Sequence, residues 1–181
     1  MPTWEIRVHR QSVQRRGSRA RTVGSYKILH DGREVADFNG IPLFGTTAEA
    51  RGPGDNSVAD NGRRVEAGRY PLWTQNGEKY VTYDYKDSEN PRIRPKPGIE
   101  LKRTGARAEI LIHPGVGFLA SIGCINLCTR LPNAAEDVSF PGSRKRVIAA
   151  IEDMKQFLGR GFPRSNGLRI PNAFAVIEGE P

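Results

Sequence analysis

Only one stretch of the 181-residue chain spaces its apolar residues as an amphipathic helix requires. In residues 143–158, apolar side chains recur at intervals of three and four, between Ser143 and Gly159 as candidate caps. The apolar residues of this face are Val147, Ile148, Ile151, Met154 and Leu158. Elsewhere, 20 glycines and 13 prolines divide the chain into short segments. We therefore predict a mainly β protein with one or two helices.

Short segments in which apolar and polar residues alternate are the expected strands. They are residues 4–9, 24–29, 34–38, 68–73, 80–85, 99–101, 108–113 and 174–177. Asp31-Gly32 and Asn76-Gly77 are turn sequences that predict antiparallel hairpins. The polar stretches 10–22 and 45–64 lack a hydrophobic period, and we expect a hairpin loop or arm and a long loop there. No linker divides the chain, so we predict a single domain over residues 1–181.

The residue types with catalytic potential gather around one strand end. The apolar run Ile110–Ile112 leads directly into His113, and Cys124 follows eleven residues later, after a glycine-rich turn. A cysteine nucleophile needs a base within hydrogen-bond reach, because the thiolate attacks and the thiol does not. A strand, a loop and a re-entering segment would bring these two side chains together. Gly123 allows close approach of the backbone, so the amides around Cys124 are candidate donors to an oxyanion.

Other readings of the same residues stay open at this level. Cys124 can be a small buried hydrophobe and His113 a plain loop residue. Cys124 and Cys128 are four residues apart, a spacing at which a disulfide is possible but rare. A metal ion held by His113 and both cysteines would lack a fourth ligand and the usual Cys-x-x-Cys pairing. We therefore predict no metal site.

The segment 121–126, with the sequence Ser-Ile-Gly-Cys-Ile-Asn, resembles the signature of the YkuD-type L,D-transpeptidases. Those enzymes have a His, a spacer and then Ser-His-Gly-Cys, followed by an apolar residue and Arg or Asn. Residues 65–72 resemble the strand that enters the core in that family, and the two blocks together cover about residues 65–131. The short spacer after His113 is similar to two outlying branches, one borne by phages and bacteria and one of type VI secretion effectors.

The resemblance implies a mixed β-sheet sandwich or barrel and a role for each matching residue. Cys124 would be the catalytic nucleophile that forms a thioester with a peptidoglycan stem peptide. His113 would be its base, oriented by the backbone carbonyl of Pro114. The amides of Gly123 and Cys124 would hold the oxyanion. The second histidine of the family signature is replaced by Ile122, so the polar contribution of that side chain is lost.

Three further polar residues complete the expected site. Ser121 and Asn126 place polar side chains on both sides of the thiol. We assign Ser121 to the catalytic group and Asn126 to substrate binding. Arg130 is near enough in sequence to meet a substrate carboxylate, and we expect it to bind substrate as well.

The resemblance therefore implies a cysteine-dependent, peptidoglycan-modifying enzyme, an L,D-transpeptidase or an L,D-carboxypeptidase that uses no cofactor. A secreted antibacterial effector is one form of it, a toxin with an immunity protein or a secretion-system component as partner. The alternative is a non-catalytic wall-binding or particle-associated module that keeps the fold. The net charge of +8 attracts polyanions. Its basic residues are dispersed without an aromatic-interleaved motif, so we predict no nucleic-acid partner.

The start of the sequence has no apolar stretch of the kind that a signal peptide contains. No segment approaches the roughly 18 consecutive apolar residues of a transmembrane helix. The expected substrate lies outside the cytoplasm. We therefore expect synthesis in the cytoplasm without a signal peptide, and action in the periplasm or cell wall after secretion-system delivery or phage lysis.

Overall fold

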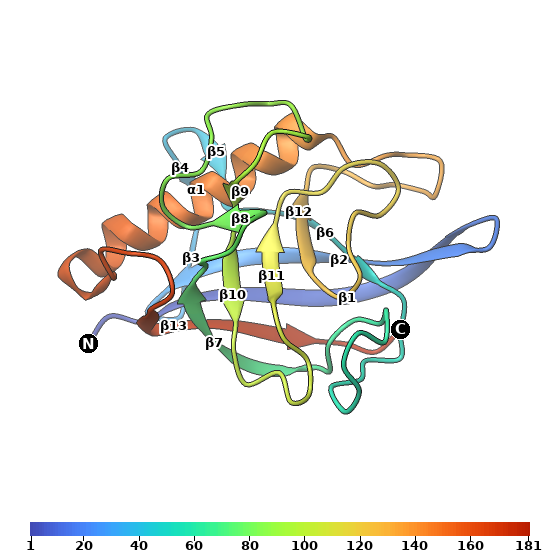
Figure 1. Cartoon of the computed structure of the whole chain (residues 1–181), viewed down its shortest axis with the longest axis horizontal. Coiled ribbons are helices and arrows are strands. Elements are labelled where there is room, and N and C mark those ends of the chain that lie inside the picture. The colour runs from blue at the N-terminus through green and yellow to red at the C-terminus, as the bar shows by residue number, and fades with distance from the viewer.

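The computed structural model describes residues 1–181 and is built mainly from strands (Figure 1). The strands are β1 (Trp4–Arg16), β2 (Arg19–His30), β3 (Arg33–Val35), β4 (Asp37–Phe38), β5 (Ile41–Pro42), β6 (Phe44–Ala50), β7 (Gly68–Thr74), β8 (Tyr80–Val81), β9 (Lys96–Pro97), β10 (Ile99–Leu101), β11 (Ile110–His113), β12 (Ile125–Cys128) and β13 (Arg169–Glu178). The helices are α1 (Phe140–Leu158) and the short 3₁₀ helix η1 (Gly159–Gly161).

Eight strands close into a barrel in the order β1-β13-β7-β10-β11-β12-β6-β2, because β1 also pairs with β2. β1 runs parallel to β13 and antiparallel to β2, and β3 adds an edge strand to β2. The pairs β4–β5 and β8–β9 form two small ribbons outside the barrel. The prediction of a mainly β fold with one or two helices is therefore confirmed.

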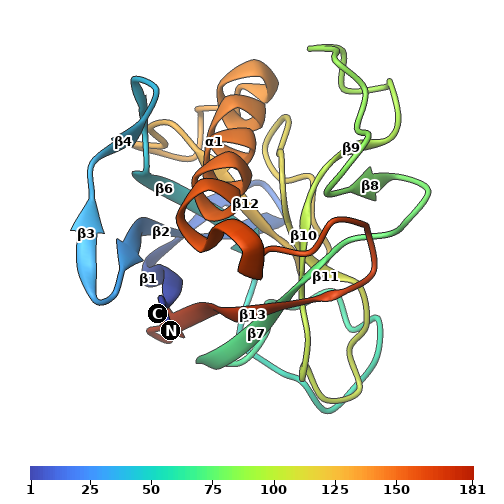
Figure 2. The same ribbon diagram turned by 90° about the vertical axis from the view of Figure 1, so that its left-hand side faces the viewer.

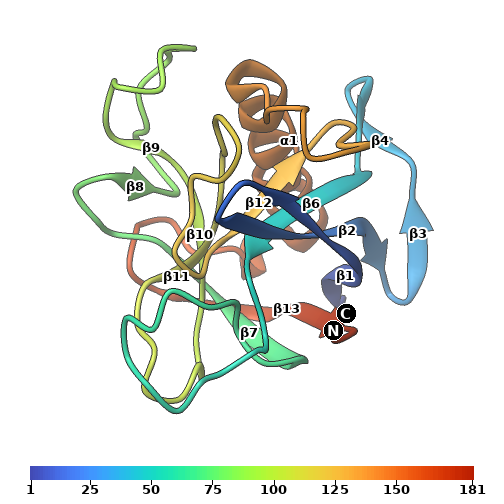
Figure 3. The ribbon, with the colours of Figure 1, turned by 90° about the vertical axis from the view of Figure 1, so that its right-hand side faces the viewer.

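The β1–β2 hairpin is much longer than the sequence suggested. The prediction of a hairpin loop or arm over residues 10–22 is wrong. Both strands continue through this stretch, and the turn between them is at Gly17. Buried Arg10 is paired through its Nε and Nη2 with both carboxylate oxygens of Glu49, at 2.9 and 2.7 Å. A paired arginine can lie inside a strand that its charge seemed to exclude. In Figure 3 the turn of this hairpin faces the viewer, beside β12.

Two other expected boundaries need correction. The first residues of the expected loop 45–64 belong to β6, which pairs with both β2 and β12. The helix begins at Phe140, and its N-cap is Ser139, whose side chain accepts a hydrogen bond from the Gly142 amide. Ser143 lies inside the helix and is fully buried. The helix ends at Gly159 as predicted.

Helix α1 completes the core of the barrel. Figure 2 shows it over the strands, with β6 on one side and β10 and β11 on the other. Its buried residues Val147, Ile151 and Met154 belong to the same hydrophobic cluster as Trp4 and Ile28 from the barrel strands. Neither helix is long and apolar enough to cross a bilayer.

The pairing of β11 with β12 positions the residues of interest. The two strands are parallel neighbours, with Ile112 opposite Ile125 and His113 opposite Asn126. Alternate residues of a strand face opposite sides of the sheet. Ile112 and Ile125 face the core, so His113 and the residue just before β12, Cys124, face the other side.

Candidate active site

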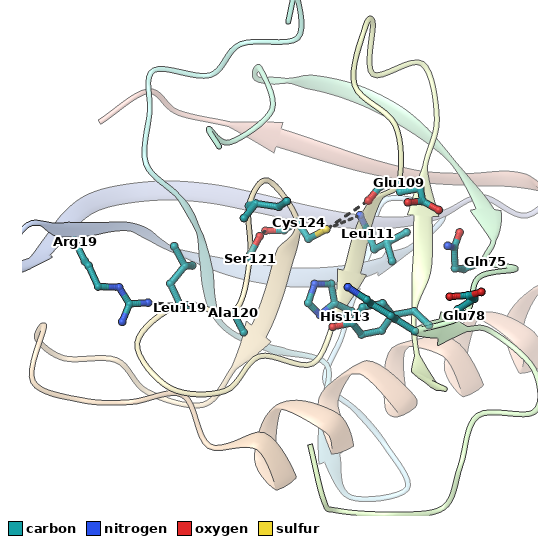
Figure 4. A pocket seen from close by; sticks show the side chains of 13 residues that line it. Arg19, Gln75, Glu78, Glu109, Leu111, His113, Leu119, Ala120, Ser121 and Cys124 are labelled. Carbon is teal, nitrogen blue, oxygen red and sulfur yellow. Dashed lines mark hydrogen bonds between the residues drawn. The ribbon is translucent and has the colours of Figure 1, made fainter. Parts of the chain in front are cut away.

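An open cavity of about 790 Å³ lies against this outer side of β11 and β12 (Figure 4). His113 and Cys124 both line it. The other lining residues are Arg19, Gln75, Glu78, Lys79, Tyr80, Glu109, Leu111, Leu119, Ala120, Ser121 and Ile122. The fold therefore brings the expected nucleophile and the expected base to one cavity, from the two ends of the loop that joins adjacent strands.

The thiol of Cys124 is held between two backbone groups. Its Sγ accepts a hydrogen bond from the Leu111 amide at 3.3 Å and donates one to the Glu109 carbonyl at 3.5 Å. Burial raises the pKa of the Cys124 thiol to about 11, against the smaller lowering effects of the Leu111 amide and of Arg107. The group is therefore a neutral thiol near neutral pH.

The imidazole of His113 is fixed as a neutral base. Its Nδ1 lies 2.8 Å from the Pro114 carbonyl oxygen, which can only accept, so Nδ1 carries the proton in this assignment. Nε2 is then free to take a proton. Burial lowers the pKa of His113 to about 4, so the ring is uncharged near neutral pH. The ring of Tyr80 covers it, with centroids 4.2 Å apart.

No hydrogen bond joins the His113 ring to the Cys124 thiol. The thiol donates to the Glu109 carbonyl instead. Both groups are neutral, so the resting site is not a thiolate–imidazolium pair. Figure 4 shows the two side chains lining the same cavity, His113 from the end of β11 and Cys124 from just before β12.

Ser121 organises the turn that precedes the thiol. Its Oγ donates to the Cys124 carbonyl at 2.7 Å and accepts from the Gly123 amide at 3.1 Å. The Gly123 amide, expected to bind an oxyanion, is therefore engaged by Ser121 in this arrangement. Ser121 lines the cavity and shapes the turn around the nucleophile.

Arg107, whose role the sequence did not indicate, also supports this turn. Its guanidinium is buried and donates to the carbonyls of Asp55, Arg63 and Ile122, at 3.0, 2.9 and 3.2 Å. Gly123 has a φ of 150°, and a Cβ there would lie 2.2 Å from Arg107 Nη2. The φ of Gly123 strains any other residue, and a Cβ would also displace the guanidinium of Arg107, which explains the glycine at this position.

The two expected substrate-binding residues lie outside the cavity. Asn126 is fully buried, and its Nδ2 donates to the backbone carbonyl of His113 at 3.1 Å. It therefore holds the end of β11. Arg130 is exposed beyond β12 and lines a different cavity, together with Leu131 and Pro132. The structure does not bring it near Cys124.

Ser143 on α1 also supports the site. Its Oγ accepts from the Gly115 amide at 2.9 Å and donates to the Leu127 carbonyl. It therefore ties the loop that follows His113 to both the helix and β12. Ile122, at the position of the second family histidine, is 73% exposed at the rim of the cavity. Its side chain leaves the interior of the site open.

Several cavity residues could not be found from sequence. Gln75, Glu78, Lys79 and Tyr80 come from the turn and ribbon strand that follow β7, and only the turn sequence Asn76-Gly77 marks that region. Glu109 has a left-handed backbone, with φ 52°, immediately before β11. Such non-glycine outliers are over-represented at functional sites.

The two cysteines are both free thiols. No group of three or more His, Cys, Asp or Glu side chains is arranged to hold a metal ion.

Comparison of the chain with family models, with curated proteins and with solved structures gave no match. The resemblance to the YkuD-type L,D-transpeptidases therefore stays a prediction, resting on residues 65–72 and 121–126 and on the preceding His113.

Proposed function

We propose that this protein is a cysteine-dependent acyltransferase of the L,D-transpeptidase type that acts on peptidoglycan stem peptides. One observation carries the proposal. His113, with its Nδ1 held by the Pro114 carbonyl at 2.8 Å, lines the same open cavity as Cys124. That orienting bond is the one that the family resemblance implies for the catalytic base.

The acylation step follows from these groups. His113 Nε2 takes the thiol proton while Sγ of Cys124 attacks the carbonyl carbon of the scissile amide, forming a C–S bond. The tetrahedral intermediate collapses with cleavage of the C–N bond. The imidazolium returns its proton to the leaving amine. The product is a thioester on Cys124 and a free amino acid or peptide.

Deacylation regenerates the thiol. An acceptor amine attacks the thioester carbonyl in transpeptidation or exchange, and water attacks it in the carboxypeptidase reaction. His113 accepts the proton of the attacking group and passes it to the departing sulfur as the C–S bond breaks. Nothing in this sequence of steps requires a cofactor.

The neutral resting pair sets the order of events. With the thiol pKa at about 11 and the imidazole pKa at about 4, proton transfer is uphill before substrate is bound. The substrate therefore has to move the thiol from the Glu109 carbonyl toward Nε2. The buried cation of Arg107, which favours the thiolate, offsets part of this cost.

The same observation favours a second candidate, a non-catalytic module that binds the cell wall. A protonated thiol without a hydrogen bond to the base is also what an inactive relative would retain. In that case the cavity would bind stem peptides without turning them over.

Incubation with purified sacculi, followed by muropeptide profiling, separates the two candidates. The wild type is expected to change the profile, and Cys124→Ala is expected to leave it as in the buffer control. Cys128→Ala is the matched cysteine variant and should act like the wild type. Identical profiles from wild type and Cys124→Ala, with both proteins retained on the sacculi, would establish the binding module instead.

Delivery to the cell wall is part of the proposal, because the substrate lies outside the cytoplasm. We propose an effector or lysis-associated role, with an immunity protein or secretion component as partner. Fusing the chain to a periplasmic signal peptide and expressing it in a Gram-negative host tests this. Growth arrest with the wild type but not with Cys124→Ala is expected, and equal growth of both strains would contradict an antibacterial role.

A further inference from the structure

Four charged side chains form a cluster that is not part of the cavity around Cys124. Arg10 and Arg64 are 2% and 1% exposed, and Glu49 is fully buried. Glu49 accepts hydrogen bonds from Arg10 with both carboxylate oxygens, at 2.9 and 2.7 Å. Glu180, which follows β13, accepts from Arg10 at 3.1 Å and from Arg64 at 2.9 Å. None of the four lines the cavity, so the proposed mechanism leaves this cluster unexplained.

Glu180 is the only acidic partner of the buried Arg64. The guanidinium of Arg64 otherwise donates to neutral oxygens, the Thr22 hydroxyl at 2.7 Å and the Pro181 carbonyl at 3.2 Å. Its Nε has no partner. The carboxylate of Glu49 is engaged by Arg10, so Glu180 alone balances the charge of Arg64, although its side chain is 45% exposed.

Glu180 also joins the two sides of the loop between β6 and β7, residues 51–67. Its Oε2 accepts from the Gly54 amide on one side, at 3.2 Å, and from Arg64 Nη2 on the other. A Cβ on Gly54 would lie 2.8 Å from Glu180 Oε1, so the glycine allows the carboxylate to approach the loop closely. The Asp55 amide donates to the Arg64 carbonyl at 3.1 Å, next to this contact. Glu180 therefore closes the base of the loop.

Arg107 binds the same loop one residue further along each side. Its guanidinium donates to the carbonyls of Asp55 and Arg63, at 3.0 and 2.9 Å. Each of these two residues is the direct neighbour of one that Glu180 contacts. Arg107 also donates to the Ile122 carbonyl at 3.2 Å, in the turn before the thiol. The base of the loop therefore lies between the Glu180 carboxylate and the guanidinium that supports this turn.

We propose that Glu180 is a positioning residue for Cys124, which acts by fixing the base of the β6–β7 loop and thereby the guanidinium of Arg107. Without the carboxylate, Arg64 is a buried cation that lacks an acidic partner, which is strongly destabilising. The base of the loop then loosens, and the carbonyls that hold Arg107 lose their fixed places. Because Arg107 favours the thiolate of Cys124, its displacement makes the thiol less reactive. The inference rests on the proposed function for its bearing on catalysis, but thiol reactivity is measured without turnover.

The Glu180→Gln variant removes the negative charge and keeps the size of the side chain. Alkylation of Cys124 by iodoacetamide, followed by mass spectrometry of its peptide, should slow about threefold at a fixed pH below the thiol pKa. The pH–rate profile should move to higher pH by about half a pH unit. Glu5→Gln is the matched control, because Glu5 also pairs with two arginines, Arg7 and Arg69, and none of these residues lies in the loop. It should leave the Cys124 profile unchanged.

A double variant tests the route of the effect. In the Arg107→Gln background the guanidinium is already absent, so adding Glu180→Gln should slow alkylation no further. Glu180→Asp keeps the negative charge and should recover part of the rate. An unchanged rate in Glu180→Gln, or the same threefold slowing in the Arg107→Gln background, would overturn the proposal.

Two further measurements separate this proposal from stability and from the proposed enzyme. Urea unfolding of each variant identifies conditions in which all of them are folded, and alkylation rates are compared there. A slowing that follows the loss of stability equally in Glu180→Gln and Glu5→Gln would overturn the positioning role. A wild type that is inactive on sacculi but gives the expected alkylation rates would refute the proposed enzyme and keep the positioning role.

Discussion

The two cysteines lie four residues apart in sequence, yet their surroundings differ completely. Burial raises the pKa of the Cys124 thiol to about 11 and that of the Cys128 thiol to about 12. Cys124 lines an open cavity with His113. Cys128 is 1% exposed and belongs to a small apolar cluster. The other members of that cluster are Val23, Ala48, Leu131 and Val138.

The comparison teaches that thiol acidity alone does not distinguish the candidate nucleophile. Both thiols are protonated near neutral pH. What Cys124 has in addition is access, an oriented neutral imidazole, and a preceding turn that Gly123 and Arg107 hold in place.

The largest effect is expected from the thiols themselves. Cys124→Ala should abolish any change in muropeptides, because no other group in the cavity can form the thioester. Cys128→Ala should keep activity within about twofold, since small buried substitutions outside a site act mainly on stability. Muropeptide profiling at matched protein concentration measures both. Comparable loss in the two variants would remove the distinction between the cysteines.

His113→Asn should lower the acylation rate by about 10²–10⁴-fold. The asparagine amide can still donate to the Pro114 carbonyl, so the loop is retained while the base at Nε2 is lost. Acylation of Cys124 by a stem peptide, followed by intact mass, measures the rate. Near wild-type acylation in this variant would show that His113 is not the base.

Stability should depend on pH through the same histidine. Its pKa in the folded protein is about 4, below the ordinary 6.5, because burial disfavours the imidazolium. Between these values the unfolded chain binds a proton that the folded protein does not, so stability falls as pH decreases from 6.5 toward 4. The loss should reach about 3 kcal/mol and be absent in His113→Asn. Urea unfolding across this range checks it, and parallel profiles for both proteins would contradict it.

The support of the Cys124 turn should give a smaller effect. Arg107→Gln removes a buried cation that favours the thiolate, so alkylation of Cys124 by iodoacetamide should slow about tenfold at a fixed pH below the thiol pKa. Arg107→Lys should recover part of the rate. A pH–rate profile separates a shifted pKa from a disturbed turn, because only the first moves the midpoint.

Arg21 offers the matched control for that experiment. It is also buried and donates to three backbone carbonyls, those of Phe118, Asn133 and Glu136. Arg21→Gln should therefore cost stability without moving the Cys124 profile. An equal shift from both variants would mean that Arg107 acts only through general destabilisation.

The sequence predicted some parts of the fold whose signals are local, but the hairpin expected at Asn76-Gly77 is reduced to a single antiparallel bridge, because β7 pairs with β10 and β13 and β8 pairs with β9. Asp31-Gly32 joins β2 to β3 in an antiparallel hairpin, and Gly159 ends the helix. The long strands through residues 10–22 were missed because the groups that satisfy their arginines are distant. Arg10 pairs with Glu49, and Arg21 reaches the Phe118 carbonyl. No local pattern encodes such partners.

In the candidate site, too, the residues joined by a short loop could be predicted, and those from separate loops could not. The proximity of His113 and Cys124 could be predicted from the sequence, because one short loop between parallel strands joins them. Arg107, Gln75 and Glu78 could not, since their places depend on how separate loops meet around the cavity. The expected role of Arg130 failed for the converse reason. Arg130 is close to Cys124 in sequence, but it follows β12 and lies at a different cavity.

The most direct test of the account is to trap the thioester. The protein is mixed with a synthetic stem tetrapeptide ending in D-alanine, quenched in acid and measured by intact mass. The account predicts an adduct with the mass of the tetrapeptide less D-alanine, mapped to Cys124 and absent in Cys124→Ala. No adduct on the wild type, or the same adduct on Cys124→Ala, would contradict it.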